Sequence, residues 1–505
     1  MILIVGAGPT GMTAAIELRR AGFDVRIIDK SDRMAQHSQA LVVQARTLEQ
    51  LQRYGLAKDA VARGRKLSEA RFYSDGKQIV SFKLDQVHSR YPYVLFLPQS
   101  ETEAILNQHM EGLGVKTERQ VELMRLTQED GVIRATLRHK DGAEEEVSPR
   151  WVLGCDGAHS AVRHQIGMPF EGTGYGISFF LGDLEIDGPD APQEELCIHV
   201  RHGDVVFMGR LSDRTVRLIV ALHAKQDLDQ DRRLSIEDFQ QAVDQVGVRV
   251  KIKEAQWMTP FRVTDRQAQH YRVGNIFLAG DASHIHSPVG GQGMNTGMQD
   301  VANLGWKLAV VERGADPRLL DSYEEERGEV GKSLLRFTGR GLKMATTTNP
   351  VLELLRNSLA PVLSKLEPIQ KAAIGFISET SIEYRASSIV ADVGGDGDLR
   401  AGDRLPDLAL GHATTETTLL KDRTSAKHLA LVLNGTVAEV NDVRATLPGA
   451  EVTALETSQL DKQGQRLLGG EKKVILIRPD GYVGYRGPLE STSRLVAYAR
   501  QDGLA

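Results

Sequence analysis

The sequence has few cysteines, no long apolar run and no excess of basic residues. Only Cys155 and Cys197 occur in 505 residues, which excludes a disulfide framework and is typical of a reducing compartment. No 18 apolar residues run uninterrupted, so we expect no membrane-spanning helix. The formal charge of −5 and the pI near 6.3 give no sign of a nucleic-acid surface. These features predict a cytoplasmic protein without a nucleic-acid partner.

The first thirty residues have the pattern of a dinucleotide-binding unit. An apolar run that predicts a strand leads into GAGPTG, and residues 10–21 then have helical spacing. A second predicted strand, 25–28, ends at an acidic residue. In such a unit the glycines let the backbone approach a pyrophosphate at the helix N-terminus, and the acid accepts ribose hydroxyls. The predicted contacts are Gly6, Gly8, Gly11, Asp29 and Lys30.

Two later stretches also place an acidic residue directly after a predicted strand. RWVLGCDGAHSAVR carries Asp156, and IFLAGDASHIHSPVGGQGMN carries Asp281. Because the carboxyl ends of strands in an open α/β sheet face the ligand crevice, Asp156, Arg163 and Asp281 could all face a bound cofactor. The glycine run after Pro288 would let backbone amides lie against an aromatic ring system. A helix beginning near Met294 would direct the positive end of its dipole toward that ring.

The three motifs together resemble the class A FAD-dependent aromatic hydroxylases, the p-hydroxybenzoate-hydroxylase-like flavoprotein monooxygenases. ARTLEQLQRYGL around Arg46 and PQSETEAIL with Gln99 agree with this resemblance, which covers about residues 1–390. GDRLPDLAL at 402–410 and VILIRPDGYVGYR at 474–486 resemble the thioredoxin-like C-terminal domain of the phenol-hydroxylase and polyketide-hydroxylase branch.

The resemblance implies an α/β fold, in which a Rossmann-like FAD-binding domain carries an inserted antiparallel-sheet substrate domain. A C-terminal thioredoxin-like domain follows. No cysteine lies beyond Cys197, so that domain lacks CxxC and we expect no redox activity there. The expected divisions are 1–70, 93–171 and 259–390 for the discontinuous FAD-binding domain, 71–92 and 172–258 for the substrate domain, and 391–505 for the C-terminal domain.

The resemblance also implies roles for single residues. Asp29 would hold the adenosine ribose, Asp156 would help bind both FAD and NAD(P)H, and Asp281 would hold the ribityl chain. Arg46 and Gln99 would lie along the cofactor. The remaining expected cofactor contacts are Gly280, Pro288, Gly291, Gly293, Met294 and Asn295. One departure is Gln39, which stands where family members commonly carry Arg or Lys.

The implied reaction is reduction of FAD by NAD(P)H, capture of O₂ as a flavin C4a-hydroperoxide, and oxygen transfer to a phenolic or polycyclic polyketide-like ring. No second glycine motif has strand–helix–strand context, so we expect no separate NAD(P)H domain. No catalytic base is assigned. His284 and His286 lack a completing ligand cluster, so no metal site is expected. Position in the substrate sheet suggests four pocket residues, Tyr175, Phe180, Met208 and Arg210.

Several alternatives stay open at this point. The chain could be a Baeyer–Villiger-type or antibiotic-modifying oxygenase of the same family, or a reductase of the same fold. It could also be a flavin-binding partner protein without turnover of its own. A flavin-dependent halogenase is disfavoured, because its WxWxIP motif needs two tryptophans one residue apart and the three here are distant. The expected assembly is a monomer or a homodimer.

Overall fold

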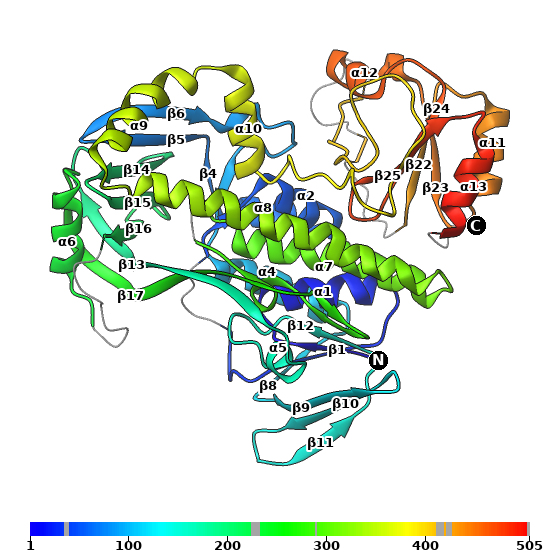
Figure 1. The fold of residues 1–505 in the computed structure, drawn as a ribbon, viewed down its shortest axis with the longest axis horizontal. Coiled ribbons are helices and arrows are strands. Elements are labelled where there is room, and N and C mark those ends of the chain that lie inside the picture. Colours follow the sequence, from blue (N-terminus) through cyan, green and yellow to red (C-terminus); the bar gives the residue numbers. More distant parts are fainter. Residues whose placement is uncertain (35–39, 224–232, 288–289, 411–418, 421–426, 502–505) are drawn as a thin grey trace.

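The computed structural model describes residues 1–34, 40–223, 233–287, 290–410, 419–420 and 427–501. Figure 1 shows three parts: a parallel sheet with helices, a larger sheet beside it, and a separate C-terminal unit. Segments distant in the sequence meet in the first two parts, whereas the C-terminal unit is continuous in the chain.

The first part is built on a six-stranded sheet of order β18-β19-β12-β1-β2-β8. Strands β1, β2, β8, β12 and β19 pair in parallel, and β18 pairs antiparallel at one edge. All residues of β1, β12 and β19 are buried, which explains their continuous apolar runs. The strands are β1 (Ile2–Val5), β2 (Val25–Asp29), β8 (Thr117–Arg119), β12 (Trp151–Gly154), β18 (Arg272–Val273) and β19 (Ile276–Leu278).

Helices pack on this sheet and on one another. Helix α1 contacts both α4 and α7, and α8 runs beside α7 (Figure 1). The helices of this part are α1 (Pro9–Arg20), α2 (Ala45–Arg53), α3 (Ala57–Arg63), α4 (Gln99–Gly112), α5 (Ala161–Gln165), α7 (Gly293–Glu312) and α8 (Asp321–Ala345). Two small sheets complete it, β3 (Val42–Val43) with β7 (Val94–Phe96) and β4 (Arg65–Leu67), and β9 (Glu122–Glu129) with β10 (Val132–Arg138) and β11 (Glu144–Val147).

The second part is an eight-stranded sheet of order β20-β17-β13-β16-β15-β14-β5-β6. We expected an antiparallel sheet, and the pairing is antiparallel except between β14 and β5, which run parallel. Helix α6 (Ile236–Gln245) covers one face. The strands are β5 (Glu69–Ser74), β6 (Lys77–Lys83), β13 (Phe170–Asp187), β14 (Glu195–Arg201), β15 (Asp204–Arg210), β16 (Thr215–Leu222), β17 (Lys251–Ala268) and β20 (His284–Ile285).

The C-terminal unit has a five-stranded sheet of order β21-β25-β24-β22-β23. β22 and β23 are parallel and joined through α11, whereas β24 and β25 form an antiparallel hairpin. This mixed sheet agrees with the thioredoxin-like fold expected from the sequence. The elements are β21 (Ala391–Asp392), β22 (Leu429–Leu433), α11 (Val437–Thr446), β23 (Glu451–Leu455), α12 (Lys462–Leu468), β24 (Lys473–Ile477), β25 (Val483–Pro488) and α13 (Thr492–Gln501).

A buried cluster of charges joins the C-terminal unit to α7 and α8. Arg478, just after β24, donates to the two Glu326 carboxylate oxygens at 2.6 and 2.8 Å. Lys307 of α7 donates to Glu326 at 2.8 Å, and Asp480 also accepts from Arg478. Burial alone would raise the pKa of Glu326, but the charges of Arg478 and Lys307 hold it well below its usual range. Each charge therefore depends on its partners for compensation.

Replacing Arg478 with alanine leaves Glu326 buried with one cation fewer. We expect Arg478→Ala to lower the free energy of unfolding by about 3–5 kcal/mol, measured by denaturant titration. Arg466→Ala is the control, because Arg466 pairs with Asp398 at the surface with its side chain 81% exposed, and a change near zero is expected there. Equal effects of the two substitutions would contradict this account of the interface.

Candidate flavin site

The glycine loop after β1 is shaped by close backbone contacts. Gly6 has φ +99°, and a Cβ there would lie 2.3 Å from the Cys155 carbonyl oxygen. A Cβ on Gly11 would lie 1.9 Å from the Gly6 carbonyl oxygen. Gly8 differs, because a Cβ there would meet no described atom within 4 Å. Gly6 and Gly11 are therefore required for packing, whereas Gly8 leaves the N-terminus of α1 open to a ligand.

Asp29 lies at the end of β2 beside this loop. Its Oδ2 accepts from the Ala7 amide at 2.7 Å, and its Oδ1 accepts from the Ser31 amide at 2.8 Å. The carboxylate is thus fixed next to the open side of the loop, where it retains acceptor capacity. Lys30 is exposed. The assignment of Asp29 to the adenosine ribose fits this geometry and stays a prediction.

The Asp156 carboxylate is used mainly within its own turn. It accepts from the Ala161 amide at 2.6 Å, from the Val162 amide at 3.2 Å and from the Ser160 hydroxyl. These bonds satisfy amides in the first turn of α5, whose N-cap residue is Ser160. Burial raises the pKa of Asp156. A direct cofactor contact of this carboxylate stays a prediction.

Arg163 does not face outward, which corrects the expectation that it could face the cofactor. It is buried, and it donates to the carbonyl oxygens of Ala282 at 3.0 Å and Ala158 at 2.8 Å. Its guanidinium lies 3.9 Å from the centre of the Phe170 ring. Arg163 therefore ties the turn after β12 to the turn after β19.

The turn after β19 presents Asp281 to open space. Gly280 has φ +61°, and a Cβ there would approach the Thr10 hydroxyl at 2.7 Å. The Asp281 side chain is exposed, and no described group donates a hydrogen bond to its carboxylate. Its Oδ1 lies 4.0 Å from where a Cβ on Gly293 would stand. The surrounding protein atoms nevertheless raise the pKa of Asp281 by limiting the solvation of its carboxylate.

The loop before α7 is held against β3. Gly291 has φ +63°, and a Cβ there would lie 2.7 Å from the Val42 Cβ. Asn295 donates to the carbonyl oxygens of Val42 and Gly291 at 2.8 and 2.7 Å, and its Oδ1 accepts from the Gln44 amide at 2.9 Å. Asn295 thus fixes the loop instead of presenting its amide to a ligand. Met294 packs on the core. Two sequence assignments, Pro288 and Gln39, lie outside the described residues.

His286, for which the sequence predicted no metal role, lies beside the loop before α7. Its Nδ1 bonds to the Ser287 carbonyl oxygen at 2.8 Å, which places the proton on Nδ1. Its Nε2 is buried, has no partner among the described residues, and lies 3.5 Å from the Cβ position of Gly293. Burial lowers the pKa of His286 to about 4, so the ring is neutral near pH 7 and offers a free acceptor beside the loop.

A buried carboxylate holds the turn and the helix together. Asp300 of α7 accepts from the Gly280 amide at 3.0 Å, from His284 Nε2 at 2.8 Å and from Arg327 Nε at 2.6 Å. Arg327 also donates to the Thr296 carbonyl oxygen at 3.1 Å. The side chains of Asp300, His284, Arg327 and Thr296 are all buried. Asp300 was missed because an Asp in a helix carries no motif of its own.

Arg46 and Gln99 make contacts that differ from the expected ones. Arg46 donates to Glu49 at 2.9 Å and to the Asp480 carbonyl oxygen, and its guanidinium lies 4.9 Å from the Tyr482 ring centre. It therefore belongs to the interface with the C-terminal unit. Gln99 begins α4 and donates to Glu103 at 2.8 Å. The cofactor contacts assigned to both residues stay predictions.

Two of the four pocket residues predicted in the substrate sheet lie on the face that α6 covers. Phe180 and Met208 are buried against α6, with the Phe180 ring centre 5.9 Å from that of Phe239. Arg210 donates to the carbonyl oxygens of Pro192 and Asp213. Successive side chains of a strand alternate between faces, so an error of one position exchanges the two sides. The side chain of Tyr175 lies outside what the structure describes.

The opposite face of this sheet is aromatic and faces the first part. Phe207 packs with a cluster that contains Val42 and Phe96, so it lies on the side of the Gly291 loop. Phe179 packs near Leu342 of α8, and its ring centre lies 5.2 Å from that of Phe261. This face is therefore the better candidate for a substrate wall than the α6 face.

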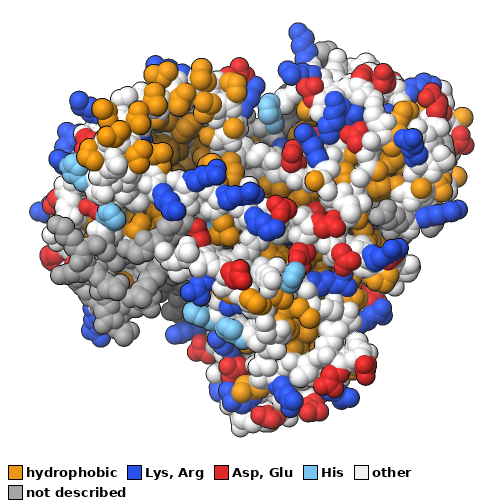
Figure 2. All heavy atoms as spheres, in the orientation of Figure 1, with side chains coloured by type: hydrophobic (Ala, Val, Ile, Leu, Met, Phe, Trp, Pro, Cys, Tyr) orange, Lys and Arg blue, Asp and Glu red, His pale blue; other side chains and the backbone are white. Residues whose placement is uncertain are grey.

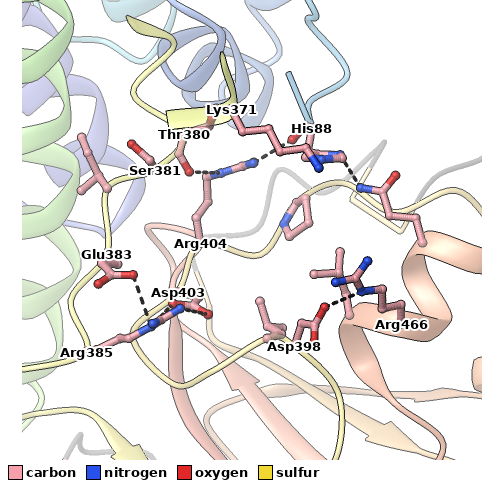
Figure 3. Close-up of a pocket in the computed structure, with 15 residues that line it drawn as sticks. His88, Lys371, Thr380, Ser381, Glu383, Arg385, Asp398, Asp403, Arg404 and Arg466 are labelled. Atoms are coloured by element: carbon pink, nitrogen blue, oxygen red, sulfur yellow. Dashed lines mark hydrogen bonds and ion pairs between the residues drawn. The ribbon is translucent and has the colours of Figure 1, made fainter. Parts of the chain in front are cut away.

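A separate hollow of about 510 Å³ lies between residues 380–406 and α12 (Figure 3). Its charges are largely matched with one another: Arg385 pairs with Asp403 at 2.6 Å and Arg466 with Asp398 at 2.7 Å. Arg404 donates to the His88 carbonyl oxygen at 2.7 Å. Because these groups already have partners, we place the candidate cofactor site at the glycine loops and not here.

Comparison with known proteins identifies the family. Residues 1–338 match the family described as FAD binding domain, and residues 398–501 match the family described as aromatic-ring hydroxylase, C-terminal. The chain belongs to the FAD-dependent flavoprotein monooxygenases. The expected fold and the FAD cofactor are thereby confirmed. The open loop at Gly8, the Asp281 carboxylate and the glycine loop before α7 fit FAD.

Relatives in this family match nearly the whole chain. The pentachlorophenol 4-monooxygenase of Sphingobium chlorophenolicum is 32% identical, over 98% of this chain and 95% of the relative. The 6-methylpretetramide 4-monooxygenase of Streptomyces rimosus is 34% identical, over 98% and 92%. The solved structure of OxyS anhydrotetracycline hydroxylase from Streptomyces rimosus has a TM-score of 0.83 and 30% identity, with 99% of both chains covered. Among the described helices, none is long and apolar enough to cross a membrane.

The contrast between Gly6 and Gly8 tests whether the glycine loop after β1 receives FAD. Gly8→Ala meets open space, so the apoprotein should change its unfolding free energy by no more than about 0.5 kcal/mol, while FAD binding falls sharply. Gly6→Ala should cost at least about 1–3 kcal/mol from backbone strain alone. Denaturant unfolding of the apoproteins and FAD titration separate the two effects. Normal FAD affinity in Gly8→Ala would refute the proposed approach of the cofactor.

Asp281 gives a second test. Asp281→Ala should raise the dissociation constant for FAD about tenfold to hundredfold, because hydrogen bonds to a charged group contribute about 1.5–3 kcal/mol, while the chain stays folded. Fluorescence titration with FAD measures the change, with Glu144→Ala on the exposed edge of β11 as control. A purified Asp281→Ala protein with stoichiometric flavin would defeat the assignment.

A third test uses Glu379, which is buried behind α7 and accepts from the Thr296 hydroxyl at 3.0 Å. Burial raises the pKa of Glu379 from 4.5 to about 8. Between these values the folded chain holds a proton that the unfolded chain has lost, so this group's stabilising contribution should fall by about 1.4 kcal/mol per pH unit as the pH rises. Glu379→Gln should flatten that slope in denaturant unfolding from pH 5 to 8. An unchanged slope would contradict the shift.

Proposed function

We propose that the chain is an NAD(P)H-consuming monooxygenase that hydroxylates a phenolic or polycyclic, polyketide-like aromatic substrate. The observation that carries this proposal is the exposed Asp281 carboxylate beside Gly293, in a loop that also packs on Val42, to whose cluster Phe207 of the substrate sheet belongs. When bound, FAD would supply the redox chemistry, taking electrons from NAD(P)H and activating O₂ so that one oxygen atom passes to the aromatic ring.

The chain's own residues would bind, orient and shield. The loop around Gly8 and the N-terminus of α1 receive the pyrophosphate, and Asp29 accepts from ribose hydroxyls. Asp281 accepts from the ribityl chain. The neutral His286 offers its Nε2 as an acceptor next to the first turn of α7, whose N-terminus favours negative charge on the neighbouring ring. No residue is assigned as a catalytic base.

The sheet and the relatives both support the proposed substrate class. Phe179, Phe207 and Phe261 lie on the sheet face that is turned to the cofactor side, and such a wall suits a flat aromatic ring and keeps water out. Relatives are named for pentachlorophenol and for 6-methylpretetramide. Cysteine usage supports a cytoplasmic location as part of the same proposal.

The test is anaerobic stopped-flow reduction of the FAD-loaded protein by NADPH and by NADH, with and without a panel of phenols and polycyclic quinones. The expected result is reduction accelerated by one substrate class, followed after mixing with ¹⁸O₂ by one labelled oxygen atom in the product. Flavin that stays oxidised with every donor and aromatic would favour the partner-protein alternative. Reduction without labelled product would favour a reductase.

A further inference from the structure

Helix α9 (Pro350–Leu363) turns its apolar side chains toward solvent, which is the reverse of the usual arrangement in a globular protein. None of its residues is buried, although it is rich in leucine and valine. Large apolar side chains continue outward beyond its end toward α10 (Glu367–Ile377), and Figure 2 shows the resulting patch over both helices. The exposed members are Phe337, Met344, Val351, Leu352, Leu354, Leu355, Leu359, Val362, Leu363, Leu366 and Ile369, which we call the α9 patch.

The inward side of α9 is polar and anchored. Arg356 donates to the carbonyl oxygens of Met344 and Ala345, each at 3.2 Å, and to the Ser74 hydroxyl at 3.2 Å. Its Nε donates to Asn357 at 3.1 Å. These bonds fix the rotation of the helix, so the apolar side chains face outward because the polar ones are held inward.

The α9 patch is larger than a free surface ordinarily carries. Its side chains are 39–67% exposed, which amounts to roughly 1,000 Å² of mostly apolar surface, against about 300–600 Å² for the largest patch on a typical monomer. Such an area exposed to water is costly, at roughly 25 cal/mol per Å². An apolar partner of comparable extent is therefore expected to cover it.

The border of the patch is basic although the chain is acidic. Between residues 335 and 371 there are six Lys or Arg and two Glu, a formal charge of +4, whereas the whole chain carries −5. Five of the cations are exposed, namely Arg336, Arg340, Lys343, Lys365 and Lys371. Figure 2 shows basic side chains beside the apolar patch, over α8.

We propose that the α9 patch docks on an anionic lipid surface. Exposed leucine and valine on α9, with lysine and arginine on the adjoining α8 and around α10, resemble the pattern of a helix that lies in the membrane interface. Anionic lipid satisfies both the apolar area and the positive border. A two-fold dimer through the same patch would bring each basic border against its copy, with like charges facing. The membrane surface is thus favoured over a second copy of the chain.

The first test is flotation of the FAD-loaded chain with vesicles of phosphatidylglycerol and phosphatidylcholine, compared with phosphatidylcholine alone. We expect binding to the anionic vesicles that weakens as salt is raised. Leu354→Glu combined with Leu359→Glu should lower the partition coefficient at least about tenfold. Val437→Glu is the matched control, because Val437 is 80% exposed but lies on α11 in the C-terminal unit.

The second test reverses charge on the border. Lys343→Glu with Lys365→Glu should lower binding to anionic vesicles by about tenfold or more, while thermal midpoint and FAD content stay unchanged. Equal binding to neutral and anionic vesicles, or full binding by the leucine variant, would overturn the proposal. So would a concentration-dependent dimer in sedimentation velocity that the leucine variant abolishes, since a second copy would then be the occupant.

Discussion

The ion pair between Asp300 and Arg327 is the contact on which the candidate site depends. Both side chains are fully buried, so each charge would be costly alone, and His284 and the Gly280 amide complete the set of partners. Gly280 precedes the Asp281 carboxylate, and Arg327 also bonds to Thr296 in the first turn of α7. The Asp300 carboxylate therefore fixes the turn at Gly280 and the start of α7, the two segments that would enclose the flavin ring.

Buried, compensated charges on α7 also hold the C-terminal unit in place. Lys307 and Asn303 of α7 meet Glu326, Arg478 and Asp480 in a buried cluster, and Arg46 reaches the Asp480 carbonyl oxygen from the start of α2. Helix α7 thus carries the glycine loop of the candidate site at its N-terminus and contacts the C-terminal unit along its length. This gives a unit without cysteine a structural role, because displacing it would expose unpaired charges next to the helix that orders the site.

Charged side chains are buried in one part of the chain, and apolar side chains are exposed in another. In both parts the hydrogen-bond partners of the polar groups explain the arrangement. Around Asp300 and Glu326, charged groups are buried because each has several partners. On α9, Arg356 points inward because it donates hydrogen bonds to carbonyl oxygens, and the leucines are exposed to solvent. The first arrangement is complete within one molecule. The second becomes favourable only with an external apolar surface, which is the physical basis of the membrane proposal.

The sequence by itself determined what depends on neighbouring residues. The strand, glycine loop, helix and acid of residues 2–29, the strand before Asp156 and the start of α7 near Gly293 were all predicted, because backbone conformation is largely local. Only the tertiary structure decided which face Phe180 and Met208 occupy, where the Arg46 guanidinium points, and that Asp300 lies under Gly280. Those outcomes depend on strand register and on partners more than a hundred residues away or on another element, and no local pattern encodes them.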